Sequence, residues 1–385
     1  MQPGNSIEIR PVATYRDMGV FIDVPWQIHA RNPMWVPPLR LEQRMHFSRF
    51  NPYCKHAQWQ GWVAYQNARP VGRISAQIDI LYQQRHGHDR GHFGFLESIN
   101  DETVCSALMQ AAENWLSARG VQHVSGPFNF SINQECGILV EGFDSPPVVM
   151  MPYSPDWYGR LLEQAGYRPC KDLLAYWINC DFETPAVLQA MAYKYRDRIQ
   201  VRPIQRQNFR AEIELLRDIF NDAWSENWGF VPLTEAEFSE LGSIMKWLIP
   251  ESFVQIAAVD GVPAAFMVML PNFNEILHQL NGKLLPLGWL QLIRQARSCA
   301  ITTARVPLMG VRKQFHDTLL GMMLAFNVID VPRKNAFARG IQAVELSWIL
   351  EDNLPMRAIL NKIGGKEYKR YRLYEKILPG RPQCE

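Results

Sequence analysis

Residues at the ends of three predicted strands could bind phosphate or accept a proton. Arg312 and Lys313 follow the strand-like run ARVPLMGV and precede a helical run. Backbone N–H groups at a helix N-terminus are exposed donors that attract phosphate oxygens, and nearby cations add to this attraction. Glu351 follows the run AVELSWIL and Glu275 follows LPNFN, where a carboxylate could act as a general base. Each glutamate could equally be a capped or salt-bridged surface group, and both alternatives stay open.

The elements that must position these residues follow one order twice along the chain. The first half predicts a strand at 7–14, a helix at 15–30 interrupted at Pro25, a hairpin, a strand at 92–99, a helix at 101–119, a strand, a short helix at 155–165 and a strand at 173–180. The second half repeats this order from a strand at 199–205 to a closing strand at 370–378, with a hairpin that turns at Asp260 and Gly261. The predicted fold class is therefore α+β, with each half a mixed, mostly antiparallel sheet flanked by helices.

Length and charge narrow the class of protein further. The 385 residues suggest two domains, which we predict as 1–195 and 196–385. The 40 basic and 38 acidic residues are too balanced for a typical nucleic-acid-binding surface. The seven cysteines are scattered, without a C-x-x-C pair, which favours a reducing compartment. No secretory signal or membrane span is visible, so we expect a cytoplasmic protein.

A histidine-rich segment, QQRHGHDRGH, raises the alternative of a metal site. It contains His86, His88 and His92, with Asp89 as the only nearby carboxylate. This set is poor in ligands compared with typical metal motifs. We predict a solvated turn between strands and no bound metal.

The repeated order of elements resembles the GNAT acyltransferase superfamily, and a passage near the C-terminus supports the resemblance. Asn353, Lys362 and Gly364 fall in register with the superfamily stretch N-x-x-A-I-x-L-Y-x-K-x-G-F. The resemblance implies a cofactor contact at Asn353, although an ordinary helix N-cap would also suit that position. Leu360 stands where many members carry a catalytic tyrosine. A thiolate leaving group scarcely needs an acid.

The run VRKQFHDTLLG resembles the superfamily's pyrophosphate loop, Q/R-x-x-G-x-G/A. Gly321 can take the last position, whereas His316 stands in place of Gln or Arg and Leu319 in place of the first glycine. The resemblance implies that His316, Gly321, Arg312 and Lys313 contact the diphosphate of acyl-CoA, although His316 could simply start the helix. It also implies that backbone groups between Met309 and Val311 bind the thioester and the oxyanion.

The first half departs from this loop pattern. Glu97, Asp101 and Glu102 stand where phosphates would have to lie, and like charge disfavours a phosphate there. We therefore predict that residues 196–385 bind acyl-CoA and that residues 1–195 form a substrate or scaffold domain.

Several longer passages resemble a bacterial family of tandem GNAT-like proteins, to which bacterial ceramide synthases are related. These passages are GPFNFSINQECGILVEGFDSPP, AWSENWGFVP, LPNFNE and SWILEDN. The resemblance implies transfer of an acyl group from acyl-CoA to a small-molecule or lipid amine, with a long-chain, sphingoid-like amine as the preferred acceptor. Asn133, Tyr153 and Trp228 are the candidate substrate contacts. The alternative is a catalytically silent ligand-binding or regulatory protein that kept the fold.

An insertion at residues 276–297 adds a possible contact with lipid. Its leucines and Trp289 are bordered by Lys283, Arg294 and Arg297, a pattern that suits a helix covering an alkyl groove or lying on a bilayer. Packing against its own domain is the other alternative. We expect a monomer or homodimer, with peripheral membrane contact as an option.

Overall fold

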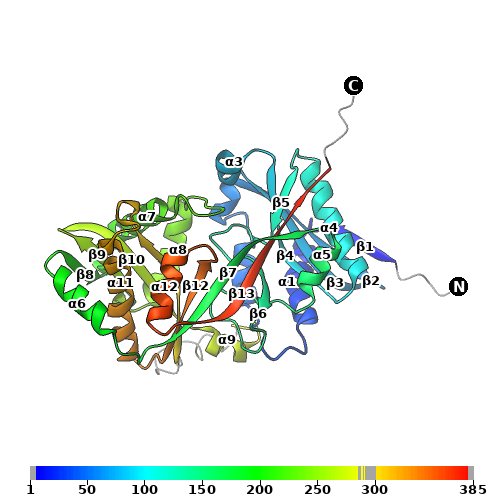
Figure 1. The fold of residues 1–385 in the computed structure, drawn as a ribbon. Coiled ribbons are helices and arrows are strands. Elements are labelled where there is room, and N and C mark those ends of the chain that lie inside the picture. The colour runs from blue at the N-terminus through cyan, green and yellow to red at the C-terminus, as the bar shows by residue number, and fades with distance from the viewer. Residues whose placement is uncertain (1–5, 285–287, 289, 291–300, 380–385) are drawn as a thin grey trace. The chain divides into compact units, whose positions relative to one another are not determined.

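A computed structural model describes residues 6–284, 288, 290 and 301–379. The chain forms two compact units (Figure 1). The N-terminal unit comprises Met1–Leu173, Leu277–Leu285 and Lys369–Glu385, and the C-terminal unit comprises Leu174–Ile276 and Pro286–Tyr368. The functional division into residues 1–195 and 196–385 remains a prediction.

The N-terminal unit contains a mixed sheet with helices packed on it. Its elements are β1 (Ile7–Pro11), α1 (Tyr15–Ile28), α2 (Arg40–His46), the 3-10 helix η1 (Pro52–Lys55), β2 (Ala57–Gln66), β3 (Arg69–Asp79), α3 (Ile80–His86), β4 (Arg90–Ser98), α4 (Glu102–Ser117), β5 (His123–Gly126), β6 (Ile138–Glu141), α5 (Tyr158–Gln164) and the start of β7 (Arg168–Asn179). The strand order is β1-β2-β3-β4-β5-β13, where β13 (Lys366–Ile377) lies mainly in this unit and also pairs with β6. Among the pairs from β1 to β5, only β4 and β5 run parallel within the described part of the unit.

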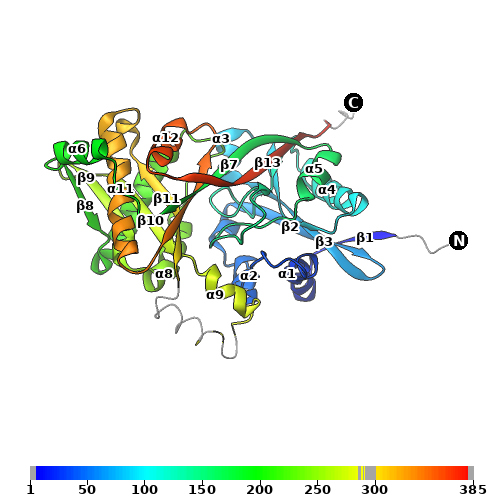
Figure 2. The same cartoon turned by 60° about the horizontal axis from the view of Figure 1, so that its bottom comes forward.

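The C-terminal unit repeats this plan. It holds the end of β7, α6 (Ala186–Tyr195), β8 (Ile199–Pro203), η2 (Arg206–Asn208), α7 (Phe209–Trp224), α8 (Glu235–Leu248), η3 (Glu251–Phe253), β9 (Val254–Val259), β10 (Val262–Pro271), the start of α9 (Asn274–Leu280), β11 (Thr303–Val311), η4 (Lys313–Phe315), α11 (Leu319–Phe337), β12 (Ala343–Leu350) and α12 (Leu354–Lys362). The strand order is β12-β11-β10-β9-β8, antiparallel except for β11 and β12. Figure 2 shows α11 lying along this sheet, where it contacts β8 to β11. The predicted fold class is confirmed.

Helix α1 continues through Pro25, contrary to the predicted interruption. A proline cannot donate to the carbonyl four residues earlier, which here belongs to Phe21. The Nη1 of Arg73 donates to that Phe21 carbonyl at 2.9 Å. An arginine from β3 therefore supplies the donor that the proline lacks, and the helix persists.

The histidine-rich segment is not a solvated turn between strands. His86 ends α3, and His92 lies inside β4 with 3% of its surface exposed. Burial lowers the pKa of His92 to about 4, so the imidazole is a neutral core group. The described residues contain no cluster of three or more His, Cys, Asp or Glu able to hold a metal ion.

Three helices, α2, α3 and α8, were not predicted, and the insertion is only partly described. Helix α8 begins with a capping box in which Glu237 N donates to Thr234 Oγ1 at 3.3 Å and Thr234 N donates to Glu237 Oε2 at 3.0 Å. Of the predicted amphipathic segment 276–297, α9 covers the first residues, and residues 285–287, 289 and 291–297 lie outside the described part. No described helix is long and apolar enough to cross a bilayer.

Candidate functional site

Strands β11 and β12 separate along their length, and this separation defines the candidate site. They pair in parallel only from Thr303 opposite Ala343 to Val306 opposite Leu346. Beyond that point β11 continues to Val311 and β12 continues to Leu350, but the two strands no longer pair with each other. The register between β10 and β11 also shifts in this region, as in a β-bulge, which bends a strand away from its neighbour. The backbone of Met309 and Val311 therefore lies in the separated half of β11.

The N-terminus of α11 lies just beyond this separated half. Thr318 is the N-cap, and its Oγ1 accepts from Gly321 N at 3.0 Å. The N–H groups of Leu319 and Leu320 make no hydrogen bond to any described residue, and Leu319 is 60% exposed. Two backbone donors at the positive end of a helix are thus available to an anion.

Glycine is required at position 321 by close packing of the preceding loop. A Cβ atom there would stand 1.9 Å from the carbonyl oxygen of Phe315. The ring of His316 bonds back to β11, with Nε2 at 2.8 Å from the Val311 carbonyl. Gly321 and His316 therefore hold the loop against the strand. Their contact with a diphosphate stays a prediction.

Arg312 and Lys313 are near this helix start but are paired with an acidic residue of α7 and one just beyond its end. Arg312 Nη2 lies 2.5 Å from Asp218 Oδ2, and Lys313 Nζ lies 3.0 Å from Glu226 Oε1. The backbone N–H of Lys313 donates to Asp222 at 3.0 Å. A diphosphate would have to compete with these carboxylates for the two cations.

The other predicted contacts at this edge have clear structural roles. The Met309 carbonyl accepts from Trp224 Nε1 at 2.7 Å. Asn353 is the N-cap of α12, because its side chain accepts from Met356 N at 3.2 Å. Glu351 directly follows β12 at the same carboxyl edge as Val311.

Glu275 lies at the opposite end of β11. Its carboxylate accepts from Thr302 N at 3.0 Å and from Thr303 N at 2.9 Å. Eight residues of strand separate Thr303 from Val311, or roughly 26 Å. These contacts favour a structural role for Glu275 in holding the start of β11.

A buried polar cluster at the point of separation was missed by sequence reasoning. Arg305 and Glu345 are opposite one another on β11 and β12 and are 2% and 0% exposed. Ser347 Oγ donates to Glu345 Oε1 at 2.5 Å and accepts from Arg305 Nε at 2.9 Å. The hydroxyl of the half-buried Tyr368 donates to the other oxygen of Glu345. The sequence AVELSWIL contained a signal for this cluster, because Glu345 and Ser347 are two residues apart and share one face of a mostly apolar strand.

In the N-terminal unit the corresponding strands also separate, but a loop fills the space. Strands β4 and β5 pair only from Arg90 to His92. Phe128 N then donates to the Phe93 carbonyl at 2.8 Å, and Phe95 N donates to Asn129 Oδ1 at 2.8 Å. A Cβ atom on Gly94 would stand 1.8 Å from the Phe128 carbonyl.

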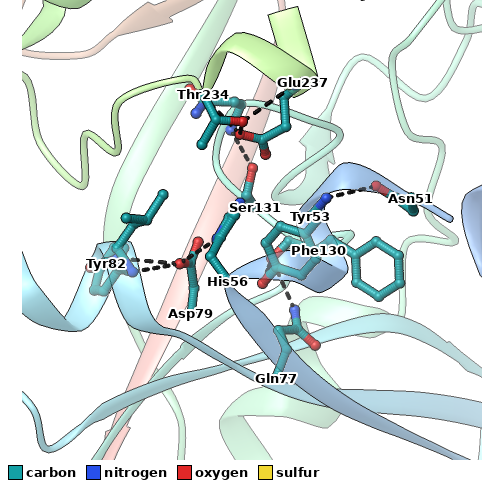
Figure 3. A network of polar contacts seen from close by, with 12 residues as sticks. Asn51, Tyr53, His56, Gln77, Asp79, Tyr82, Phe130, Ser131, Thr234 and Glu237 are labelled. Carbon is teal, nitrogen blue, oxygen red and sulfur yellow. Dashed lines mark hydrogen bonds and ion pairs between the residues drawn. The ribbon is translucent and has the colours of Figure 1, made fainter. Parts of the chain in front are cut away.

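This filling loop is fixed by polar side chains (Figure 3). The carbonyl of Phe130 accepts from the Tyr53 hydroxyl at 3.0 Å and from the Gln77 amide at 3.4 Å. His56 Nδ1 lies 3.0 Å from Asp79 Oδ1, which also accepts from Leu81 N at 2.8 Å. Side chains of the surrounding structure therefore hold the loop in its place between the strands.

Two of the acidic residues that argued against phosphate in this unit, Asp101 and Glu97, are engaged in the structure. Asp101 is the N-cap of α4 and accepts from Thr103 N at 2.8 Å. Glu97 accepts from the Tyr158 hydroxyl at 2.7 Å and pairs with His29 at 3.0 Å. Burial raises the pKa of Glu97, but His29, Arg73 and Tyr158 outweigh it and leave the pKa below its ordinary value.

The three candidate substrate contacts lie in different units. Tyr153 belongs to the N-terminal unit, where its ring packs edge-on to His29 and its hydroxyl donates to the Phe143 carbonyl at 3.1 Å. Asn133 lies in the same unit, in the loop with Phe130, and its N–H donates to Ser131 Oγ at 3.2 Å. Trp228 follows α7 in the C-terminal unit. Within neither unit does the structure bring all three together.

Two curated proteins are similar to this chain over nearly its whole length. Protein YghO of Escherichia coli is 44% identical over 369 residues, which cover 96% of this chain and 95% of that protein. Bacterial ceramide synthase of Caulobacter vibrioides is 40% identical over 375 residues, which cover 97% and 98%. No family model matches the chain.

Solved structures share the fold at low identity. A tandem GNAT protein from the clavulanic acid biosynthesis pathway superposes with a TM-score of 0.55 at 13% identity, covering 97% of this chain and 98% of that one. A GCN5-related N-acetyltransferase from Sphaerobacter thermophilus gives 0.50 at 15% identity, covering 97% and 96%. Both match across the two units.

Proposed function

Since the chain belongs to the family of bacterial ceramide synthase and YghO and is an acyltransferase of tandem GNAT fold, we propose that it transfers an acyl group from acyl-CoA to an amine. The observation that carries this proposal is the separation of β11 from β12 beside the two unpaired N–H groups of α11. Such a gap gives backbone donors to a thioester, and the helix start gives donors to a diphosphate.

The comparison between the two units supports a donor site in the C-terminal unit. In the N-terminal unit, Phe128 and Asn129 fill the gap between the strands, and Asp101 caps the following helix with a carboxylate. In the C-terminal unit, the uncharged hydroxyl of Thr318 caps α11. A negative cap repels a diphosphate, whereas a hydroxyl cap does not.

The reaction requires one proton acceptor and one oxyanion site. The amine nitrogen attacks the thioester carbon, the carbonyl becomes an oxyanion, and collapse breaks the carbon–sulfur bond and releases the CoA thiolate. The amine gives up a proton in forming the amide. We assign the acceptor to Glu345, with Tyr368 passing the proton: the phenol takes the amine proton as its own moves to Glu345 Oε2. Glu351 remains the alternative base at the same edge.

The preferred acceptor is a long-chain, sphingoid-like amine. The name of the Caulobacter relative denotes synthesis of ceramide, and identity of 40% over nearly the whole chain supports a related substrate here. A cytoplasmic location, a monomeric or homodimeric state and peripheral contact with a membrane stay predictions that accompany this proposal.

A catalytically silent ligand-binding protein is the second candidate, and two observations favour it. The cations Arg312 and Lys313 are paired with Asp218 and Glu226. Leu360, where many members of the superfamily carry tyrosine, is fully buried and has no acidic group.

Calorimetric titration with CoA, acetyl-CoA and palmitoyl-CoA, followed by incubation with palmitoyl-CoA and sphinganine, separates the two candidates. The proposal expects thioester binding and equal amounts of new amide and free thiol. Binding without amide or thiol would support the silent protein. An absence of binding to all three would overturn the donor assignment.

A further inference from the structure

A largely apolar cavity lies inside the C-terminal unit, between α7, α8 and the sheet. Together with the solvent at its mouth, the space measures about 490 Å³. Helix α7 contributes Phe209, Ile213 and Leu216, and helix α8 contributes Phe238 and Leu241. Arg206, Lys246 and Glu251 are the charged residues of the lining and most of the others are apolar, so the space favours an apolar occupant.

The floor of the cavity leads to the separated half of β11. Val268 and Leu308 are directly opposite one another on β10 and β11, and both line the cavity. Cross-strand partners lie on the same face of a sheet. Leu308 immediately precedes Met309, whose carbonyl bonds to Trp224 at the end of α7. The inner end of the cavity is therefore one residue along the strand from the proposed thioester site.

The opposite end of the cavity carries the charged residues. Arg206 and Glu251 line it, are 42% and 44% exposed, and lie 3.9 Å apart as an ion pair. Lys246 Nζ lies 4.9 Å from the centre of the Phe209 ring. Polar groups thus mark the solvent end, and the apolar lining continues inward from Phe209 to Leu216 and Leu308.

The dimensions suit an alkyl chain. Seven helical residues from Phe209 to Leu216 span about 10 Å, and eight more to Trp224 span about 12 Å. A single lipid chain covers about 15 Å, because two chains fill a hydrocarbon core about 30 Å thick. Along this line a chain that starts at Met309 would pass Leu216 by about 3 Å and occupy the inner end of the cavity.

From these observations we infer that the cavity between α7 and α8 binds the alkyl chain of a long-chain acyl donor. This inference rests on the proposed function, because it places the thioester at the separated half of β11. It adds a chain-length preference to that function, since each methylene buried in an apolar cavity strengthens binding.

The test compares the wild type with Leu241→Trp, which fills the cavity from α8 where Leu241 is only half-buried. Ser243→Trp is the matched control, because Ser243 is exposed on the same helix and does not line the cavity. Calorimetry measures the Kd of each protein for acetyl-CoA, palmitoyl-CoA and free palmitate. Circular dichroism checks that each variant is folded.

The wild type should bind palmitoyl-CoA more tightly than acetyl-CoA. Leu241→Trp should weaken palmitoyl-CoA and palmitate by about tenfold or more, the equivalent of two buried methylenes, and leave acetyl-CoA unchanged. A folded Leu241→Trp protein with unaltered palmitoyl-CoA affinity would overturn the inference. So would a variant that changes the KM for sphinganine and not for palmitoyl-CoA, because the cavity would then hold the acceptor. Wild-type binding of palmitate that Leu241→Trp abolishes, without binding of any CoA thioester, would retain an alkyl cavity and reject the proposed donor site.

Discussion

Glu345 is a fully buried carboxylate that receives two hydroxyl donors and lies opposite Arg305. A buried charge of this kind costs free energy unless it is paired, so its presence at the point of strand separation requires an explanation. The proposed reaction supplies one, because a base has to be shielded from water and yet connected to the substrate by a proton path. Tyr368 provides that path.

Replacing Glu345 by glutamine should lower kcat by about 100-fold, the usual contribution of general base catalysis, with little change in the Kd for palmitoyl-CoA. Loss of the partner of Arg305 will also reduce stability, so thermal unfolding must be measured beside turnover. Tyr368→Phe keeps the buried charge and should show the same separation of kcat from Kd. A folded Tyr368→Phe protein with normal kcat would contradict the proton path.

Reversing the charges of Arg312 and Lys313 to glutamate should weaken CoA binding by at least about tenfold, because the variant places two anions beside the diphosphate position. Arg339→Glu, just beyond the C-terminal end of α11, is the control for charge reversal away from the proposed diphosphate position. Titration calorimetry at low and physiological salt measures the CoA affinity of the double variant and of the control. Equal affinity of the double variant and the control would place the diphosphate elsewhere.

At the scale of elements, regular hydrophobic patterns predicted α4, α7 and the repeated strand order well. The fold resisted prediction where a tertiary contact overrode local preference, as at Pro25, whose missing N–H is replaced by Arg73. Helix α8 was missed although Thr234 and Glu237 form a capping box, because Gly242 inside the helix lowers its local helix propensity.

For the candidate site, the sequence predicted the location, at the junction of β11 and α11, but not the partners of the side chains there. Arg312, His316 and Gly321 are together at the junction of β11 and α11, as the loop resemblance implies. Their actual partners, Asp218, the Val311 carbonyl and the Phe315 carbonyl, come from tertiary packing that no local pattern records.

Thr234→Ala removes the N-cap of α8 and should reduce the free energy of unfolding by about 1 kcal/mol. Ser239→Ala in the same helix is the control, since Ser239 is exposed and lies inside the helix. Urea denaturation measures both variants. If the Thr234 variant is as stable as the Ser239 variant, the capping box contributes nothing measurable.

At the scale of the whole molecule, buried histidines make stability depend on pH. Burial lowers the pKa of His92 from 6.5 to about 4, so the folded state binds its proton less readily than the unfolded chain. The resulting stabilisation is complete above about pH 6.5 and is lost as the pH falls towards 4. It amounts to about 3 kcal/mol.

His92→Gln removes this titration, so its unfolding free energy should fall less steeply than that of the wild type between pH 6.5 and pH 4. The comparison uses urea denaturation at several pH values in that range. Parallel curves for the two proteins would show that His92 titrates normally in the folded state.

The gap between β11 and β12 in the C-terminal unit is open, whereas a loop fills the gap between β4 and β5 in the N-terminal unit. We assign the acyl donor to the open gap. A crystal structure of the chain with bound CoA tests this assignment most directly. We expect the diphosphate at the N–H groups of Leu319 and Leu320, with the thiol arm beside Met309. A nucleotide bound near Asp101 in the N-terminal unit, or side chains occupying the gap between β11 and β12, would contradict it.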